Sequence, residues 1–117
     1  MKDELTIPNT IEVVLVDQNQ PAETWGIIPT VKAFQSLVKG DIILHTLADG
    51  IVAVTNAEAM IIGLPVNVTV DGVDLCGPVV FTKVKDGKFV ALDPVDRLDI
   101  KIKIKEARLA RMEAARA

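Results

Sequence analysis

Three Asp-Gly dipeptides constrain the fold of this chain more than any other feature. Each lies between two runs rich in β-branched and apolar residues: Asp49-Gly50 within DIILHTLADGIVAVT, Asp71-Gly72 between VNVTV and VDLCG, and Asp86-Gly87 between VVFTKVK and KFVAL. Asp-Gly suits the type I′ turn, because both central residues take positive φ there and glycine does so without a steric penalty. Three such turns predict three hairpins in an antiparallel β-meander.

A helix is predicted over residues 30–39, inserted among these strands. Thr30 is a suitable N-cap, and the apolar residues after it recur on one helical face. Gly40 stands where a glycine in the left-handed conformation commonly ends a helix. The β-branched run at residues 10–16 predicts a strand before it.

The C-terminal segment supports two interpretations. Asp93-Pro94 is a strong helix start, and one helical stripe follows, formed by Val95, Leu98, Ile102, Leu109 and Met112. Residues 98–104, however, alternate between apolar and polar, which is the period of a strand. We favour a long helix over about residues 94–115; the alternative is an edge strand over residues 98–105, followed by a short helix.

In the long helix, Ile100 and Ile104 lie off the predicted stripe and need a second cover, for which a partner chain is a candidate. The predicted fold class is therefore α+β, with a sheet domain over residues 1–93. The helix over residues 94–117 is either part of that domain or an oligomerisation element. The residues predicted for an oligomer interface are Ile100, Ile104, Leu109 and Met112.

Composition narrows the classes of partner. The 117 residues correspond to one domain, and half of them are hydrophobic. The net charge of −3 argues against a nucleic-acid partner, although residues 100–117 are basic. No apolar run approaches the ~20 residues of a membrane helix, and the N-terminus lacks the pattern of a signal peptide. We expect a cytoplasmic homo-oligomer that does not bind membranes.

The stock of catalytic side chains is small. The chain has one histidine, one cysteine, no tyrosine and a single serine, Ser36, on the predicted helix. No glycine-rich phosphate loop is present, and the two thiol or imidazole groups are too few for a structural zinc site. The sequence therefore predicts a non-enzymatic protein without cofactor or metal. A hydrolase that uses a carboxylate-bound metal is an open alternative to this prediction.

Candidate ligand-binding residues centre on the stretch NAEAMIIGLPVN. Asn56 ends one predicted strand and Asn67 opens the next, on either side of a Gly-Leu-Pro break. Their amides either cap turns or face a ligand, since an amide both donates and accepts hydrogen bonds. On the residues alone, turn capping is the favoured interpretation. Glu58 lies in the same stretch and completes this part of the candidate site.

Two further residues join the tentative ligand set. Trp25 lies in a predicted loop and is either a lid on the core or a platform for a flat ligand. His45 lies on a predicted strand and is either a hydrogen-bonded strand histidine, which we favour, or a ligand contact.

The segment from about Thr30 to Leu92 resembles a family of small uncharacterised domains carried by phages, plasmids and other mobile elements. Members of that family show a helix that ends in a Leu-Val-x-Gly-like motif, a strand hairpin, an Asn-x-Glu turn and a Gly-Leu-Pro-x-Asn motif. The matching residues here are 37–40, 56–58 and 63–67. Lys39, Ala59 and Met60 depart from the family pattern. Met60 stands where the family usually has a lysine in that turn, so this chain would not bind a ligand through that lysine.

The resemblance implies a mobile-element origin and the fold, but no established activity. Our first hypothesis is a small non-enzymatic accessory protein, with counter-defence as its role, which sequesters a nucleotide-like ligand or binds a host protein in the host cytoplasm. The alternative is a structural or assembly protein whose C-terminal helix drives oligomerisation.

Overall fold

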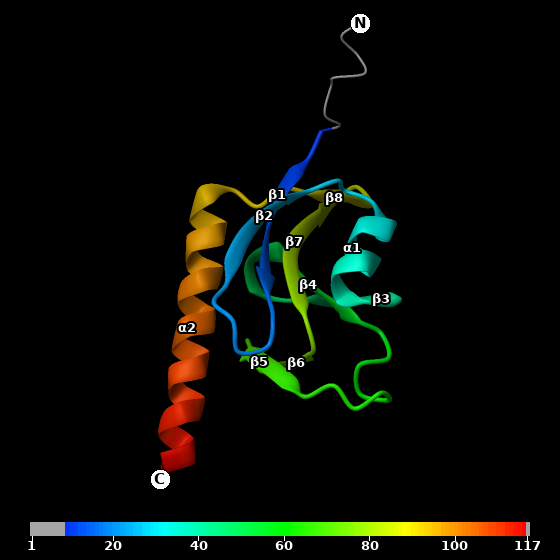
Figure 1. Cartoon of the computed structure of the whole chain (residues 1–117). Helices are drawn as coiled ribbons and strands as arrows, with labels where there is room; N and C mark the ends of the chain where they lie inside the picture. The colour runs from blue at the N-terminus through cyan, green and yellow to red at the C-terminus, as the bar shows by residue number, and fades with distance from the viewer. Residues whose placement is uncertain (1–8, 117) are drawn as a thin grey trace, which may run out of the picture.

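The computed structural model describes residues 9–116, and the fold is α+β, as predicted (Figure 1). The strands are β1 (Ile11–Val16), β2 (Glu23–Ile27), β3 (Ile42–Thr46), β4 (Ile51–Asn56), β5 (Val66–Val70), β6 (Val73–Cys76), β7 (Val79–Lys85) and β8 (Lys88–Val90). The helices are α1 (Val31–Val38) and α2 (Pro94–Arg116), and η2 (Ala48–Gly50) is a short 3-10 turn.

The three Asp-Gly hairpins are confirmed. They join β3 to β4, β5 to β6 and β7 to β8, each as an antiparallel pair. Both residues of every Asp-Gly dipeptide have positive φ, as at Asp86 (52°) and Gly87 (75°). The aspartates tolerate this conformation because a short polar side chain can bond locally to the backbone.

The strand order differs from that of a simple meander. The main sheet runs β2-β1-β7-β4-β3, and β5 and β6 form a separate two-stranded sheet. β7 therefore lies at the centre, paired with β1 on one edge and with β4 on the other. β8 also pairs with β7, over residues 83–85, beyond the stretch that pairs with β1. The pairings of β7 with β1 and with β4 join strands that lie far apart in the sequence.

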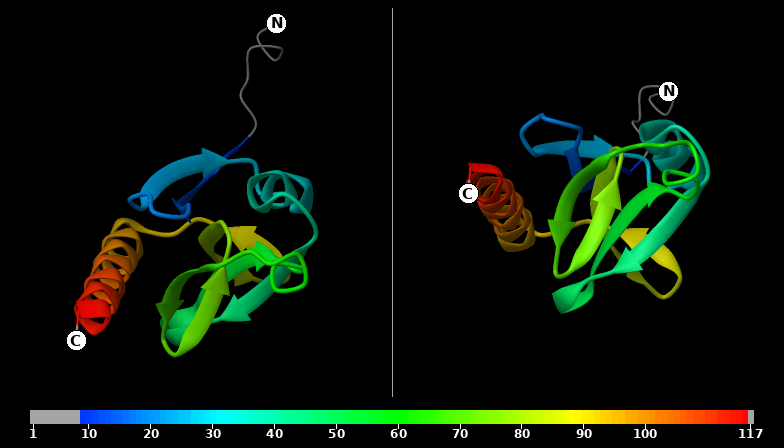
Figure 2. Two further views of the ribbon diagram at one scale, coloured as in Figure 1. Left: turned by 60° about the horizontal axis from the view of Figure 1, so that its bottom comes forward. Right: turned by 90° about the horizontal axis from the view of Figure 1, so that it is seen from below.

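Each face of the main sheet is covered by a different element (Figures 1 and 2). α1 covers one face, where Phe34 and Val38 pack on Val54 and Val80. The β5–β6 hairpin and α2 cover the other face, where a larger apolar cluster surrounds Phe81. β7 contributes alternate residues to both clusters, which is why its start is buried throughout.

The end of α1 corrects one prediction. Thr30 caps the N-terminus as expected, and its hydroxyl oxygen accepts from the Ala33 amide. The left-handed residue at the C-terminus, however, is Lys39 (φ 66°) and not Gly40. Gly40 is needed for space instead, because a Cβ there would lie 2.7 Å from Nδ2 of Asn56.

The C-terminal segment is a helix throughout, so the edge-strand alternative is wrong. Its orientation also overturns a prediction. Ile100 and Ile104 are buried in the chain's own core beside Phe81 and Leu92, so they need no partner as a cover and are not available for an interface. The predicted stripe that includes Leu109 and Met112 faces outward and is exposed. Neither helix is long and apolar enough to cross a membrane, as far as residues 9–116 show.

Candidate functional site

Asn56 links the last turn of α1 to the turn that follows β4. Its Nδ2 donates to the carbonyls of Val38 (3.1 Å) and Lys39 (3.2 Å), and its Oδ1 accepts from the Glu58 amide (2.8 Å). The side chain is buried. Both amide donors are therefore occupied, and Asn56 acts as the cap that was the favoured interpretation of the sequence, not as a direct ligand contact.

Asn67 is equally committed to the protein. Its Nδ2 donates to the carbonyls of Val16 and Gly77, both at 2.9 Å, and its Oδ1 accepts from Arg108 Nη2 at 2.8 Å. Asn67 thereby joins β1, the segment before β7, and α2. Its donors are not available to a ligand, although the residue lines a cleft.

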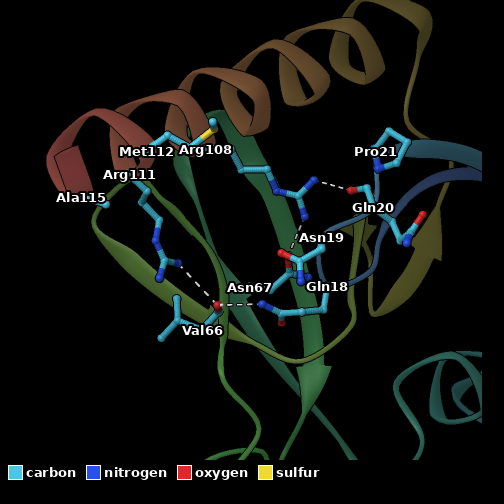
Figure 3. Close-up of a pocket in the computed structure, with 10 residues that line it drawn as sticks. All are labelled: Gln18, Asn19, Gln20, Pro21, Val66, Asn67, Arg108, Arg111, Met112 and Ala115. Atoms are coloured by element: carbon cyan, nitrogen blue, oxygen red, sulfur yellow. Dashed lines mark hydrogen bonds between the residues drawn. The ribbon is translucent and has the colours of Figure 1, made fainter.

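This cleft lies between α2, the β1–β2 loop and the start of β5, and has a volume of about 450 Å³ (Figure 3). Amide side chains from the loop and from β5 form one wall, and α2 forms the other. The lining residues are Gln18, Asn19, Gln20, Pro21, Val66, Asn67, Arg108, Arg111, Met112 and Ala115. Polar groups and two guanidinium groups thus converge on one concave surface, as in many small-ligand sites.

Arg108 secures the floor of the cleft. Its guanidinium donates to the carbonyls of Gln20 and Asp17 and to the side chain of Asn67. All three acceptors are neutral. Burial lowers the pKa of the Arg108 guanidinium, and among residues 9–116 no carboxylate lies close enough to form a salt bridge with it. The group still carries its charge at neutral pH, because a guanidinium is far too basic to lose its proton there.

Arg111 is the freer of the two arginines. It is exposed, and its only hydrogen bond among the described residues is a long one, 3.4 Å, to the Val66 carbonyl. Within residues 9–116, neither arginine has a carboxylate in salt-bridge range. No acidic side chain lines the cleft. The cleft therefore combines two uncompensated positive charges on a chain whose net charge is negative.

One acceptor in the cleft lacks a donor. Gln18 Nε2 donates to the Val66 carbonyl at 3.3 Å, but Gln18 Oε1 is buried and accepts no hydrogen bond from the described residues. Buried polar atoms are normally satisfied by protein, water or ligand. An ordered water would satisfy this oxygen, whereas a ligand would reach it only after the Gln18 side chain moves, because the atom is not exposed to solvent.

The other predicted ligand residues lie elsewhere. Trp25 is in β2, not in a loop, and is 43% exposed on the α1 face of the sheet. Its Nε1 donates to Glu23, and it lines a separate hollow beside α1. Asn56 lines a third hollow, with Leu64 and Pro65. The structure therefore does not bring Trp25, Asn56 and Asn67 together in one cavity.

His45 and Glu58 also lie outside the cleft. The His45 ring Nε2 is 3.1 Å from the Thr55 hydroxyl on the neighbouring strand, which agrees with the hydrogen-bonded strand histidine that we favoured. Glu58 is exposed, and its backbone amide bonds to Asn56. Neither residue lines the Arg108–Arg111 cleft.

The groups capable of catalysis are dispersed. Ser36 lies on α1, His45 on β3 and the half-buried Cys76 on β6. Across residues 9–116, no three His, Cys, Asp or Glu side chains gather in the way that a metal ion would require.

The arginines of the cleft were missed, because residues 100–117 were identified from the sequence only as a basic segment, with no partner assigned to them within the protein. A usable signal was present. Arg108 and Arg111 are three residues apart, so they share a side of the helix, and Arg108 lies four residues after the buried Ile104. Their position along the buried stripe indicates that they meet the body of the protein.

Comparison with known proteins agrees with the sequence resemblance in one respect: the chain matches a family of uncharacterised domains. No curated protein and no solved structure gave a significant match. A family model described as a domain of unknown function, DUF3846, matches residues 11–105, which span the sheet, α1 and the first half of α2. The chain therefore belongs to the DUF3846 family.

Proposed function

We propose that the protein is a non-enzymatic binding protein that holds a small anionic ligand of nucleotide size in the cleft beside α2. The observation that carries this proposal is the pair Arg108 and Arg111, which face one concave surface without a neutralising carboxylate among the described residues. Guanidinium groups pair well with phosphate, because their planar donors match two oxygens at once.

The size and polarity of the cleft also favour such a ligand. About 450 Å³ is within the usual range of small-molecule sites. The wall of amide side chains supplies donors and acceptors, and Gln18 Oε1 has no donor of its own. A nucleotide carries both an anionic group and hydroxyl or amino donors, so it complements the cleft better than a simple anion does.

The biological setting belongs to the proposal as well. The resemblance to domains of mobile elements supports an accessory role, in which the protein removes a nucleotide-like signal from the host cytoplasm and so opposes host defence. Expression of the protein should then protect a phage in a host whose defence uses a nucleotide signal, and a variant with a damaged cleft should not. Equal protection by both proteins would refute the link between cleft and role.

The binding test begins with native mass spectrometry of the protein incubated with a bacterial small-molecule extract, followed by titration calorimetry with nucleoside triphosphates and inorganic pyrophosphate. The variant to compare is Arg111→Gln, since Arg108 also holds the fold together. A charge-assisted hydrogen bond contributes about 1.5–3 kcal/mol, so the variant should bind roughly 10-fold or more weakly.

Arg116→Gln is the matched control. It makes the same change on the same helix but does not line the cleft. Binding that survives Arg116→Gln and weakens with Arg111→Gln supports the proposal. An absence of any added mass and of any heat of binding, or equal weakening in both variants, contradicts it.

A second candidate function, binding of a host protein, has its own observation. Met60, Ile61 and Ile62 are 84%, 82% and 59% exposed at the tip of the turn that Asn56 caps. Hydrogen bonds from Ile62 to Glu58 and from Leu64 to Ala59 fix this turn. An ordered apolar tip loses little conformational entropy on binding, and adjacent exposed apolar residues are typical of interaction sites. Replacing Met60 and Ile61 by serine should abolish capture of a host partner without lowering stability.

A further inference from the structure

The outer face of α2 carries an unpartnered apolar stripe. Its members are 46–66% exposed: Val95, Leu98, Ile102, Leu109 and Met112. Ile100 and Ile104 point to the opposite side of the helix and fill the core. α2 is thus apolar on two faces, of which the protein buries only one.

The spacing of the exposed residues is that of a coiled coil. Starting at Val95, steps of three and four residues lead to Leu98, Ile102, Lys105, Leu109, Met112 and Arg116. The first six of these residues are the a and d positions of three consecutive heptads, with Lys105 as the only polar one, and Arg116 is the a position of the next heptad. β-branched residues at the first two a positions and leucine at the first d position favour a two-stranded assembly.

The charges beside this stripe specify the orientation of the partner helix. The e positions are all acidic (Asp99, Glu106 and Glu113), and the first two g positions are basic (Lys101 and Arg108). A parallel pair of identical helices brings each g position near the e position five residues further along its partner, which sets Lys101 beside Glu106 of the other copy. An antiparallel pair would set acid against acid and base against base.

The Lys101–Glu106 pair contributes most of the preference for the parallel over the antiparallel orientation. Arg108 is already bonded to Asn67 and to the β1–β2 loop, so it is less available to a second chain. Glu106 is exposed and Lys101 half-buried. Two-fold symmetry repeats the pair, so each dimer would contain it twice.

The position of α2 leaves room for a second copy. In three views the helix forms an outer flank of the molecule, and no other described element lies beyond it on the side away from the sheet (Figures 1 and 2). Since the stripe faces away from the body, two bodies would lie on opposite sides of the paired helices. The 23 residues of α2 extend about 34 Å, long enough for three heptads to pair.

We propose that two copies of this chain form a parallel, two-stranded coiled coil through the outer face of α2. This inference does not depend on the ligand proposed for the cleft, although Met112 borders both surfaces. Of the interface expected from the sequence it keeps Leu109 and Met112, whereas Ile100 and Ile104 are buried in the core and take no part in it.

Sedimentation equilibrium over a hundredfold range of concentration tests the dimer. The full chain, with a monomer mass of 12.6 kDa, should show a monomer–dimer equilibrium. Leu98→Glu with Ile102→Glu should make it monomeric. Its urea midpoint should equal that of the unmodified protein when both are measured at a concentration where the unmodified chain is monomeric, since both side chains are exposed in the monomer. The control, Met60→Glu with Ile61→Glu, changes two exposed apolar residues elsewhere and should leave the dimer intact. A monomer at every concentration, or a dimer that tolerates Leu98→Glu with Ile102→Glu, would overturn the proposal.

Two further variants test the arrangement of the helices. Lys105→Leu removes the one polar residue of the stripe's interior and should tighten the dimer by about 10-fold or more. Glu106→Lys should weaken the dimer, and Lys101→Glu combined with Glu106→Lys should restore it. Weakening that the second change does not reverse would refute the parallel register.

Discussion

Gly40 and Asn56 should be coupled energetically, and the size of the coupling follows from their contact. A Cβ added at Gly40 would lie 2.7 Å from Asn56 Nδ2, closer than non-bonded atoms approach. Gly40→Ala therefore forces the amide away from the carbonyls of Val38 and Lys39 that it binds. Overpacking of this kind costs about 1–3 kcal/mol of unfolding free energy.

Asn56→Ala alone should cost more. It removes three hydrogen bonds, to two carbonyls at the end of α1 and to the Glu58 amide. At about 0.5–1.5 kcal/mol for each bond, the loss is roughly 2–4 kcal/mol, a large part of the ~5–15 kcal/mol that stabilises a typical domain.

The double variant separates the two effects. Gly40 is not among the residues with positive φ, so alanine fits its backbone once the Asn56 amide is gone. In the Asn56→Ala background, Gly40→Ala should then be neutral or slightly stabilising, which gives a coupling energy of about 1–3 kcal/mol.

Urea unfolding followed by circular dichroism measures this cycle. Gly26→Ala is the control, because its added Cβ meets only Thr10, at an ordinary 3.6 Å. If the effects of Gly40→Ala and Asn56→Ala simply add to within about 0.5 kcal/mol, the amide does not hold this position and the structural role assigned to Asn56 is wrong.

Three further predictions concern α2 and its attachment. Ile104→Ala should lower the unfolding free energy by about 2–4 kcal/mol, because Ile104 is buried. Ile102→Ala, measured at a concentration where the chain is monomeric, should change it by less than ~0.5 kcal/mol, because Ile102 is exposed. If urea titrations give the reverse order, the face of α2 assigned to the core is the wrong one. Arg108→Met should cost about 1–3 kcal/mol in the same assay, because it leaves the Asn67 oxygen and two carbonyls without their donor, and an unchanged midpoint would contradict this. The hydrogen bond to Asp96, 2.6 Å away, raises the pKa of Lys83, so this pair stabilises the fold below the lysine's ordinary pKa of 10.5 and the stabilisation is lost as the pH rises through the higher pKa of the folded state. The difference in urea midpoint between the unmodified protein and Lys83→Met should therefore disappear only at strongly alkaline pH. A difference that disappears near neutral pH would refute the pairing of Lys83 with Asp96.

Local features of the fold were predictable because their causes are local. The Asp-Gly turns, the Thr30 cap and the Pro94 helix start each depend on a few neighbouring residues. The central position of β7 was not predictable in this way. It arises from pairing with β1, more than sixty residues earlier in the chain, and no short pattern specifies that pairing.

The orientation of α2 shows why amphipathic patterns can mislead. The helix has two apolar stripes. Its periodicity makes the longer one the main stripe and leaves Ile100 and Ile104 in need of a second cover. The structure buries the shorter one, around Ile100 and Ile104, between two arginines that bond to the body. Arg97 donates to the Leu92 carbonyl at 2.7 Å and pairs with Glu12, and Arg108 binds the β1–β2 loop. These long-range contacts fix the rotation of the helix, and they are not visible in its periodicity.

In the candidate site, too, features with local causes were predictable and features that depend on the tertiary fold were not. Asn56 and Asn67 stood out because asparagine is depleted in strands, and the structure gives the side-chain donors of both residues backbone carbonyls of the protein as partners. The cleft itself depends on residues from three segments, residues 18–21, 66–67 and 108–115, which only the tertiary fold brings together.

The most direct test of the central claim is the affinity of the purified protein for nucleoside triphosphates and inorganic pyrophosphate, measured by calorimetry for the unmodified protein, Arg111→Gln and Arg116→Gln. The account predicts one site per chain, affinity that falls as salt rises, and roughly 10-fold or greater weakening in Arg111→Gln alone. If none of these phosphates binds and native mass spectrometry finds no adduct from a bacterial extract, the cleft is not a site for an anionic ligand.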